Sequence, residues 1–178
     1  MRIGPALAIL ALATSPALAE APQRTGPAQS PIASLVEVPA SSRLVYVSGQ
    51  VPDAVNPAAA DGSVERFGDT EAQTRSVIAK IQAVLKPHGL SLGDVVMMRV
   101  FLVAPPGQQR MDFAGMMRGY RAFFGTPGQP NKPARSTMQV GGLVDPGWLV
   151  EIEVTAAAAG AEIARCPWPR SKRGEEWS

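Results

Sequence analysis

Arg135 is the side chain in this sequence best suited to hold a small anionic ligand. It follows a loop rich in glycine and proline and begins a predicted strand over residues 134–140. The planar guanidinium can hold a carboxylate through two parallel hydrogen bonds, which a lysine ammonium cannot reproduce. A structural ion pair at the end of a strand would account for the same residue, and the residues alone leave both interpretations open.

Glu151 and Glu153 lie two positions apart in the last predicted strand, over residues 149–157. Side chains two apart on a strand point to the same face of the sheet. A partly buried carboxylate there could orient or deprotonate a water molecule, which would suit a hydrolytic reaction. Both acids could equally lie in solvent on the outer face of the strand, and this alternative also stays open.

Little in the sequence supports a metal centre or a covalent nucleophile. There is one histidine, His88, between a proline and a glycine that end a predicted helix, and one cysteine, Cys166, near the C-terminus. One residue of each type cannot form a zinc cluster or, at these positions, a predicted Cys-His pair. We therefore predict a surface turn at His88 and a site that uses no metal and no cofactor.

Hydrophobic periodicity and turn residues predict the elements that carry these side chains. The order is strand, strand, helix, strand, helix, strand, strand, over residues 35–38, 44–47, 70–85, 95–103, 113–124, 134–140 and 149–157. A short loop joins the first two strands as a pair. Thr70 and Gln73 fit a capping box for the first helix, and Asp112 fits the N-cap of the second. The methionine and aromatic stripe of the second helix predicts core packing.

Two helices and about five strands predict an α+β domain, with a mixed sheet and both helices on one face. The opposite face is then uncovered, and such a face is usually buried against another subunit. We expect a domain over residues 34–158, a flexible lead-in over 20–33 and a disordered tail over 159–178.

The first nineteen residues have the layout of a secretory signal peptide. Arg2 precedes an apolar run over residues 3–13, and small residues at positions 17 and 19 form a cleavage site before Glu20. The apolar run is too short to span a bilayer. We therefore predict an exported protein, periplasmic or secreted after cleavage near Ala19, without stable membrane insertion.

The charge pattern argues against a nucleic-acid partner, and the cysteine content excludes an intrachain disulfide. The 178 residues carry a formal net charge of +2 with both signs interspersed. This does not resemble the concentrated basic surface of a nucleic-acid-binding protein. The single cysteine precludes an intrachain disulfide, so burial of apolar side chains or subunit assembly must stabilise the fold.

Seven segments, taken together and in this order, resemble the reactive intermediate deaminase family, also called the Rid or YjgF type. They are Ser-Gly-Gln-Val-Pro at 48–52, Asp-Thr-Glu-Ala-Gln-Thr-Arg at 69–75, Gly-Leu-Ser-Leu-Gly-Asp-Val-Val at 89–96, Val-Phe-Leu at 100–102, Tyr-Arg-Ala-Phe-Phe at 120–124, Pro-Ala-Arg-Ser-Thr at 133–137 and Val-Glu-Ile-Glu at 150–153. The resemblance covers roughly residues 35–157, nearly the whole expected domain.

The resemblance implies a chorismate-mutase-like subunit that assembles as a homotrimer with ligand sites in the clefts between subunits. It also implies that Arg135 binds the carboxylate of a 2-imino acid. Glu151 would orient the water that releases ammonia and leaves a 2-oxo acid, and Thr137 and Ser48 would line the site. No cofactor is needed, because an imine is already electrophilic.

Two segments depart from the family pattern. The family's Gly-Pro-Tyr segment has no clear counterpart near residues 31–34, and residues 141–146 replace its Ala-Arg-Leu-Pro stretch. Two other functions therefore stay open. One is a non-catalytic trimeric protein of the exported compartment that binds small carboxylates through Arg135. The other is an interaction protein that uses the basic, tryptophan-containing tail, with Cys166 open to intermolecular oxidation.

Overall fold

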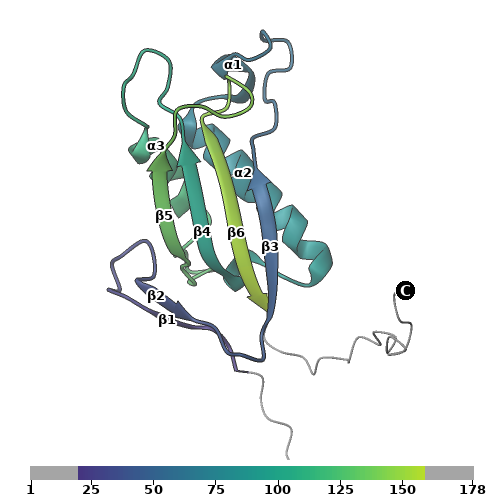
Figure 1. The fold of residues 1–178 in the computed structure, drawn as a ribbon, viewed down its shortest axis with the longest axis vertical. Coiled ribbons are helices and arrows are strands. Elements are labelled where there is room, and N and C mark those ends of the chain that lie inside the picture. Colours follow the sequence, from purple (N-terminus) through teal and green to yellow (C-terminus); the bar gives the residue numbers. More distant parts are fainter. Residues whose placement is uncertain (1–19, 159–178) are drawn as a thin grey trace, which may run out of the picture.

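A four-stranded mixed sheet forms the centre of the protein, and two helices pack on one of its faces (Figure 1). The structure is a computed structural model that describes residues 20–158. The strands lie in the order β3-β6-β4-β5, with bounds Arg43–Gln50, Val150–Ala158, Val95–Leu102 and Ala134–Gln139. β4 runs parallel to β5 and antiparallel to β6. The predicted α+β fold is confirmed.

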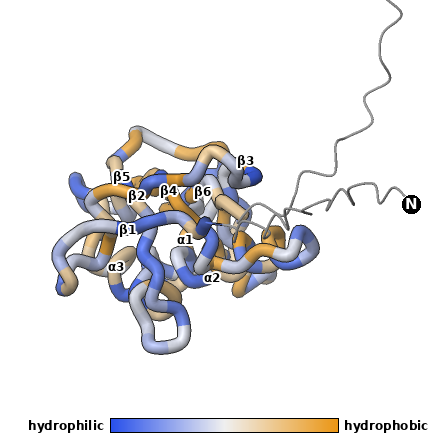
Figure 2. Tube along the Cα trace, turned by 90° about the horizontal axis from the view of Figure 1, so that it is seen from below, coloured by the Kyte–Doolittle hydropathy of each residue, from blue (hydrophilic) through white to orange (hydrophobic). Residues whose placement is uncertain are grey.

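The helices lie in one layer and the sheet in another, as the end-on view in Figure 2 shows. The long helices are α2 (Thr70–Leu85) and α3 (Phe113–Arg121). The shorter helical elements are α1 (Val64–Phe67), η1 (Lys86–His88) and η2 (Leu92–Asp94). The predicted apolar stripe of α2 is fully buried except at Val84, which is exposed, and its buried side chains join alternate side chains of β4 and β6 in the core. This alternation places every second residue of those two strands on the opposite face.

The N-terminus of α2 differs from the predicted capping box. Asp69 is the N-cap, and its Oδ1 accepts a hydrogen bond from the Ala72 amide at 2.8 Å. A carboxylate at this position satisfies a free amide and meets the positive end of the helix dipole. Gln73 instead points into the core. Its amide group donates to the carbonyls of Gly68 and Gly147, both at 2.9 Å, and accepts from the Leu149 amide at 2.7 Å.

Replacing Gln73 should therefore destabilise the fold strongly. Gln73→Leu leaves one buried amide and two carbonyls without their partner, and we expect the free energy of unfolding to fall by roughly 3 kcal/mol. Urea unfolding measures this. Gln82→Leu, on the exposed side of the same helix, should change it by less than about 0.5 kcal/mol. Equal effects of the two variants would contradict the bridging role of Gln73.

The N-terminal segment corrects two expectations. Residues 20–33, predicted as a flexible lead-in, contain β1 (Gln23–Thr25), which pairs antiparallel with β2 (Leu35–Glu37). The predicted pairing of 35–38 with 44–47 is wrong, because β3 pairs with β6. Figure 1 shows the β1-β2 ribbon lying across one end of the sheet. Arg24 fixes it there by donating to the Gly93 carbonyl at 2.9 Å, a long-range contact that no local pattern reveals.

The face of the sheet away from the helices, turned toward the viewer in Figure 1, is uncovered by the described residues. We call it the open face. It carries Leu44, Tyr46, Ser48, Met97, Arg99, Phe101, Ser136, Met138, Glu151, Glu153 and Thr155. Tyr46 is 75% exposed, although tyrosine is a large amphipathic side chain. This surface matches the bare sheet face expected from the sequence.

Two predicted segments lie outside the described residues: the signal peptide at 1–19 and the tail at 159–178, with Cys166. Within residues 20–158, no helix has the length and apolar character needed to cross a membrane.

Candidate active site

Arg135 is the second residue of β5 and lies on the helix side of the sheet. Its neighbour in the register is Met98 of β4, a fully buried core residue. The Arg135 guanidinium carbon lies 4.4 Å from the centre of the Tyr120 ring. Its Nη2 donates to the Met117 sulfur at 3.1 Å. The anchor predicted from the sequence is thus half-buried against α3.

The guanidinium of Arg135 lacks the partners that a buried cation requires. Its Nε and Nη1 are buried without a hydrogen-bond acceptor, and the Thr137 hydroxyl is also buried without a partner. None of the ion pairs among residues 20–158 includes Arg135. Burial lowers the pKa of the guanidinium because it disfavours the charged form. A ligand with acceptor oxygens would relieve this cost, since unpaired buried donors are expensive.

Tyr120 packs tightly around the anchor. Its side chain is 1% exposed, and its ring stacks on Phe124 with centroids 4.8 Å apart and planes 9° apart. Its hydroxyl donates to the Pro31 carbonyl at 3.0 Å. Burial raises the pKa of Tyr120 to about 12, and the positive charge of Arg135 opposes that shift more weakly.

The raised pKa of Tyr120 predicts a loss of stability at high pH. The folded-state pKa of about 12 exceeds the ordinary value of about 10. The contribution of the protonated Tyr120 hydroxyl to the free energy of unfolding is therefore complete below pH 10 and is lost as pH rises toward 12. In this window the free energy of unfolding should fall by up to about 1.4 kcal/mol per pH unit from this group. Urea unfolding of the wild type and Tyr120→Phe at pH 9, 10 and 11 measures the difference. Identical pH slopes would contradict it.

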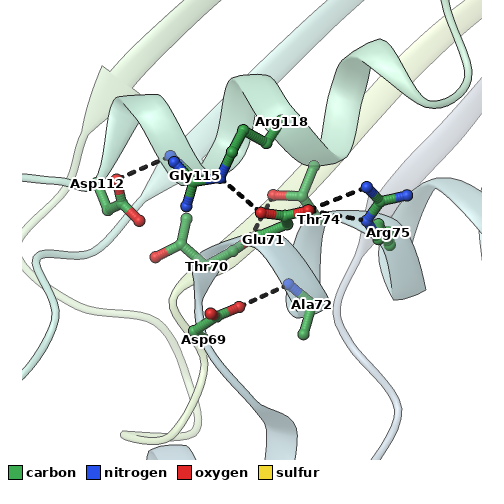
Figure 3. A network of polar contacts seen from close by, with 9 residues as sticks. All are labelled: Asp69, Thr70, Glu71, Ala72, Thr74, Arg75, Asp112, Gly115 and Arg118. Atoms are coloured by element: carbon green, nitrogen blue, oxygen red, sulfur yellow. Dashed lines mark hydrogen bonds and ion pairs between the residues drawn. The ribbon is translucent and has the colours of Figure 1, made fainter.

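Helix α3 carries both groups that surround Arg135, and a network of polar contacts holds it against α2 (Figure 3). Asp112 caps α3, as predicted, by accepting from the Gly115 amide at 2.8 Å. Glu71 of α2 accepts from Arg118 at 2.6 Å and from Arg75 at 2.9 Å. These two hydrogen bonds, that of Arg118 first, lower the pKa of Glu71. The contact between Arg118 and Glu71 thus holds the helix that carries Met117 and Tyr120 against α2.

Glu151 lies on the open face, because it alternates with the buried residues Val150 and Ile152. Its carboxylate packs against the backbone of Gly49 on β3 so closely that a Cβ at position 49 would collide with Glu151 Oε1. Glycine at position 49 therefore makes room for this carboxylate. The Ser-Gly-Gln motif contributes a close approach that sequence reasoning had not explained.

The two acids of β6 have different partners. Glu153 forms an ion pair with Arg99 of β4, with 2.6 Å between Oε1 and Nη1. Glu151 takes part in none of the ion pairs among residues 20–158. Arg99 thus neutralises Glu153 and leaves Glu151 as the acid with a free carboxylate. Sequence alternation alone could not separate the two.

Ser48 is exposed on the open face at a shallow depression of about 210 Å³. Residues that line the depression with it include Tyr46, Arg99 and Glu153. Ser48 therefore shares its face of the sheet with Glu151, whereas Arg135 and Thr137 lie on the helix side. Thr137 is adjacent in register to the buried Val100.

A single chain does not bring Arg135 and Glu151 together. Their separation of sixteen residues would allow adjacent antiparallel strands to bring them together, but β4 lies between β5 and β6, and β5 is parallel to β4. The two side chains also point to opposite faces of the sheet. Sequence pattern predicts the alternation within each strand, but sheet order and register decide which residues of different strands share a face of the sheet.

The apolar stripe of the second helix predicts Met117 and Tyr120 only as core residues. They are buried as predicted, and they also form the surroundings of Arg135. Their spacing of three residues, which places them on one side of a helix, was the available signal. His88 lies in an exposed turn, as predicted. Within residues 20–158 no three histidine, cysteine or acidic side chains are grouped as metal ligands would be.

Comparison with known proteins gives consistent matches over the described domain. The family model described as endoribonuclease L-PSP matches residues 25–158. The 3-aminoacrylate deaminase RutC of Acinetobacter baylyi is 34% identical over 135 residues, covering 76% of this chain and 93% of that protein. A RutC family protein of Haemophilus influenzae is 34% identical over 119 residues, covering 67% of this chain and 83% of that protein.

Solved structures of similar fold include two bacterial proteins. A Yersinia pestis protein of the conserved Rid family, YyfB, has a TM-score of 0.56 and 26% identity, over 78% of this chain and 100% of that one. Escherichia coli TdcF, solved with bound serine, has a TM-score of 0.51 and 27% identity, over 76% of this chain and 98% of that one.

Proposed function

Because the chain belongs to the endoribonuclease L-PSP family, which includes the Rid and YjgF proteins, we propose that it hydrolyses small 2-imino acids or related enamines to 2-oxo acids and ammonia. Its relatives support imine or enamine deamination in general. One observation carries the finer proposal. The buried Arg135 guanidinium has two nitrogen donors without acceptors.

The carboxylate of the substrate would bind at the terminal nitrogens of Arg135. Nη1 has no acceptor, and Nη2 contacts only the Met117 thioether, which is a weak acceptor that a carboxylate oxygen displaces. The Thr137 hydroxyl, two residues along the same face, offers a further donor. The name of the Acinetobacter relative fits this anchor, because 3-aminoacrylate is an enamine that carries a carboxylate.

The reaction then needs only an oriented water. The water oxygen adds to the imine carbon, the C=N double bond becomes a single bond, and the resulting carbinolamine loses ammonia to leave a C=O group. Glu151 would orient the water, accept its proton and return that proton to the nitrogen that leaves as ammonia, as a positioned carboxylate does in general acid-base catalysis. Its free carboxylate, unlike that of Glu153, supports this role.

We also propose that the protein is a homotrimer whose sites form between subunits. The opposite orientations of Arg135 and Glu151 within one chain support this arrangement, because a neighbouring copy would have to supply the second group. The partly apolar open face, with Tyr46 75% exposed, supports it as well. Arg135 and Thr137 would then come from one subunit, and Ser48 and Glu151 from the next.

The proposed activity is tested with an imino acid made in the assay. An amino-acid oxidase acting on leucine produces the 2-imino acid, whose decay and ammonia release are followed with and without the protein. We expect decay to accelerate in proportion to protein concentration. Unchanged decay, together with binding of pyruvate in a calorimetric titration, would favour the non-catalytic carboxylate-binding alternative.

We further propose that the protein is exported, on the basis of the signal-peptide layout of residues 1–19. Expression of the full chain in a Gram-negative host, followed by mass spectrometry of the periplasmic fraction, tests this. The expected mature N-terminus is Glu20. Recovery of the uncleaved chain from the cytoplasm alone would contradict the proposal.

A further inference from the structure

A closed circuit of contacts joins Arg135 to the N-terminal segment of the chain. The Arg135 guanidinium lies over the Tyr120 ring, and the Tyr120 hydroxyl donates to the Pro31 carbonyl. The Ala33 amide donates to the Pro133 carbonyl at 3.0 Å, two residues before Arg135. Tyr120 is the one side chain of this circuit that contacts both the anchor and the N-terminal segment.

The anchor itself has little else to fix its position. A buried guanidinium is usually held by a carboxylate, but none of the ion pairs among residues 20–158 includes Arg135. The Met117 sulfur is a weak acceptor, and the other two nitrogens have none. The face of the Tyr120 ring is therefore the main surface that orients the planar cation.

The Tyr120 ring is in turn held at two points. Phe124 stacks on it, and the hydroxyl is tied to Pro31. The hydroxyl bond also keeps the phenol from bonding to the ligand's oxygens, because its single proton is already used. Tyr120 thus has the contacts of a positioning residue that acts through Arg135.

We infer that Tyr120, tied by its hydroxyl to the Pro31 carbonyl, positions the Arg135 guanidinium for the ligand carboxylate and couples carboxylate affinity to the N-terminal segment. This inference rests on the proposed function, because it assigns Tyr120 a role in that same site. It predicts that weakening the tie impairs binding of the carboxylate. The chemical step is unaffected, because an anchor that binds substrate and transition state equally changes KM and leaves kcat unchanged.

Tyr120→Phe is the direct test, because it keeps the ring and removes only the hydroxyl bond. We expect KM for the imino acid, and Kd for pyruvate, to rise about three- to tenfold, the equivalent of one hydrogen bond. The kcat value should stay within about twofold. Hydrogen exchange of the Ala33 amide should accelerate, because that amide belongs to the released segment.

Thr74→Val is the matched control. It removes a buried hydroxyl bond within α2, from Thr74 to the Thr70 carbonyl at 2.7 Å, and keeps the shape of the side chain that faces Gly119 of α3. If a general loss of stability caused the effect, Thr74→Val would raise KM as Tyr120→Phe does. We expect KM and Ala33 exchange in this control to match the wild type.

Two outcomes would overturn the inference: an unchanged KM and pyruvate Kd in Tyr120→Phe, or a rise in KM equal to that of the control. Tyr120→Leu provides a second measurement. It removes the ring as well, so it should weaken pyruvate binding further than Tyr120→Phe, and equal binding would contradict the orienting role of the ring. Failure of the proposed function looks different, because the wild type would then show no turnover, whether or not it binds pyruvate.

Discussion

Arg135→Ala abolishes deamination of the 2-imino acid and leaves the protein folded. We expect kcat/KM to fall roughly a thousandfold, because the variant loses a buried, charge-assisted, two-point contact with the carboxylate. The free energy of unfolding should change by less than about 1 kcal/mol. The reason is that two of the guanidinium nitrogens are buried without acceptors, so the fold gains little from the charge. Imine decay and urea unfolding measure the two quantities.

Arg135→Lys distinguishes the two-point hydrogen bonding of the guanidinium from its positive charge. Lysine keeps the positive charge but cannot bind a carboxylate at two points or lie flat on the Tyr120 ring. We expect it to recover only a small part of the lost activity. Arg110→Ala, at an exposed arginine that is not among these contacts, serves as the control and should behave as the wild type. A lysine variant with wild-type KM would contradict the two-point anchor.

Glu151→Gln should lower kcat by about a hundredfold to a thousandfold, the range for loss of a general base. Binding of pyruvate should change little, because that probe depends on Arg135. The amide keeps the shape of the side chain against Gly49 but cannot accept a proton from water. Rapid measurement of imine decay at saturating substrate tests kcat, and calorimetry tests binding.

Glu153→Gln is the paired control for the second acid. Glu153 is already neutralised by Arg99, so its replacement should leave kcat within a few-fold of the wild type. The comparison uses samples whose assembly has the same molecular mass as that of the wild type. Equal losses of kcat in the two variants would mean that Glu151 has no special role. A larger loss of kcat in Glu153→Gln would mean that Glu153, and not Glu151, is the general base.

Most of the fold could be predicted from local patterns in the sequence. The apolar stripe of α2 and the alternation of Val150, Ile152 and Val154 along β6 are local signals. The structure confirms the alternation in full and the stripe at every position but Val84. Pairing of β1 with β2 was missed because the segment is polar and proline-rich. It is fixed through Arg24 and the distant Gly93 carbonyl. The capping-box prediction for Gln73 is wrong for the same reason, since two of its three partners lie more than seventy residues away.

The candidate site could be predicted from the sequence only in part. Residue types and family resemblance pointed to Arg135, Glu151, Thr137 and Ser48, but not to their relative positions. Those depend on β4 lying between β5 and β6, which a sequence pattern does not encode. The position of Arg135 over the Tyr120 ring likewise depends on how α3 packs relative to β5, a contact between elements distant in the sequence.

The central claim is that Arg135 of one subunit works with Glu151 of another, and mixed trimers test it most directly. Arg135→Ala and Glu151→Gln chains carrying different tags are expressed together, and trimers containing both are isolated by both tags in succession. In a closed ring of three such chains, one site has both functional groups whichever variant is in the majority. We predict about a third of the wild-type rate from two inactive parents. Activity no higher than that of the separate variants, in verified mixed trimers, would contradict the account.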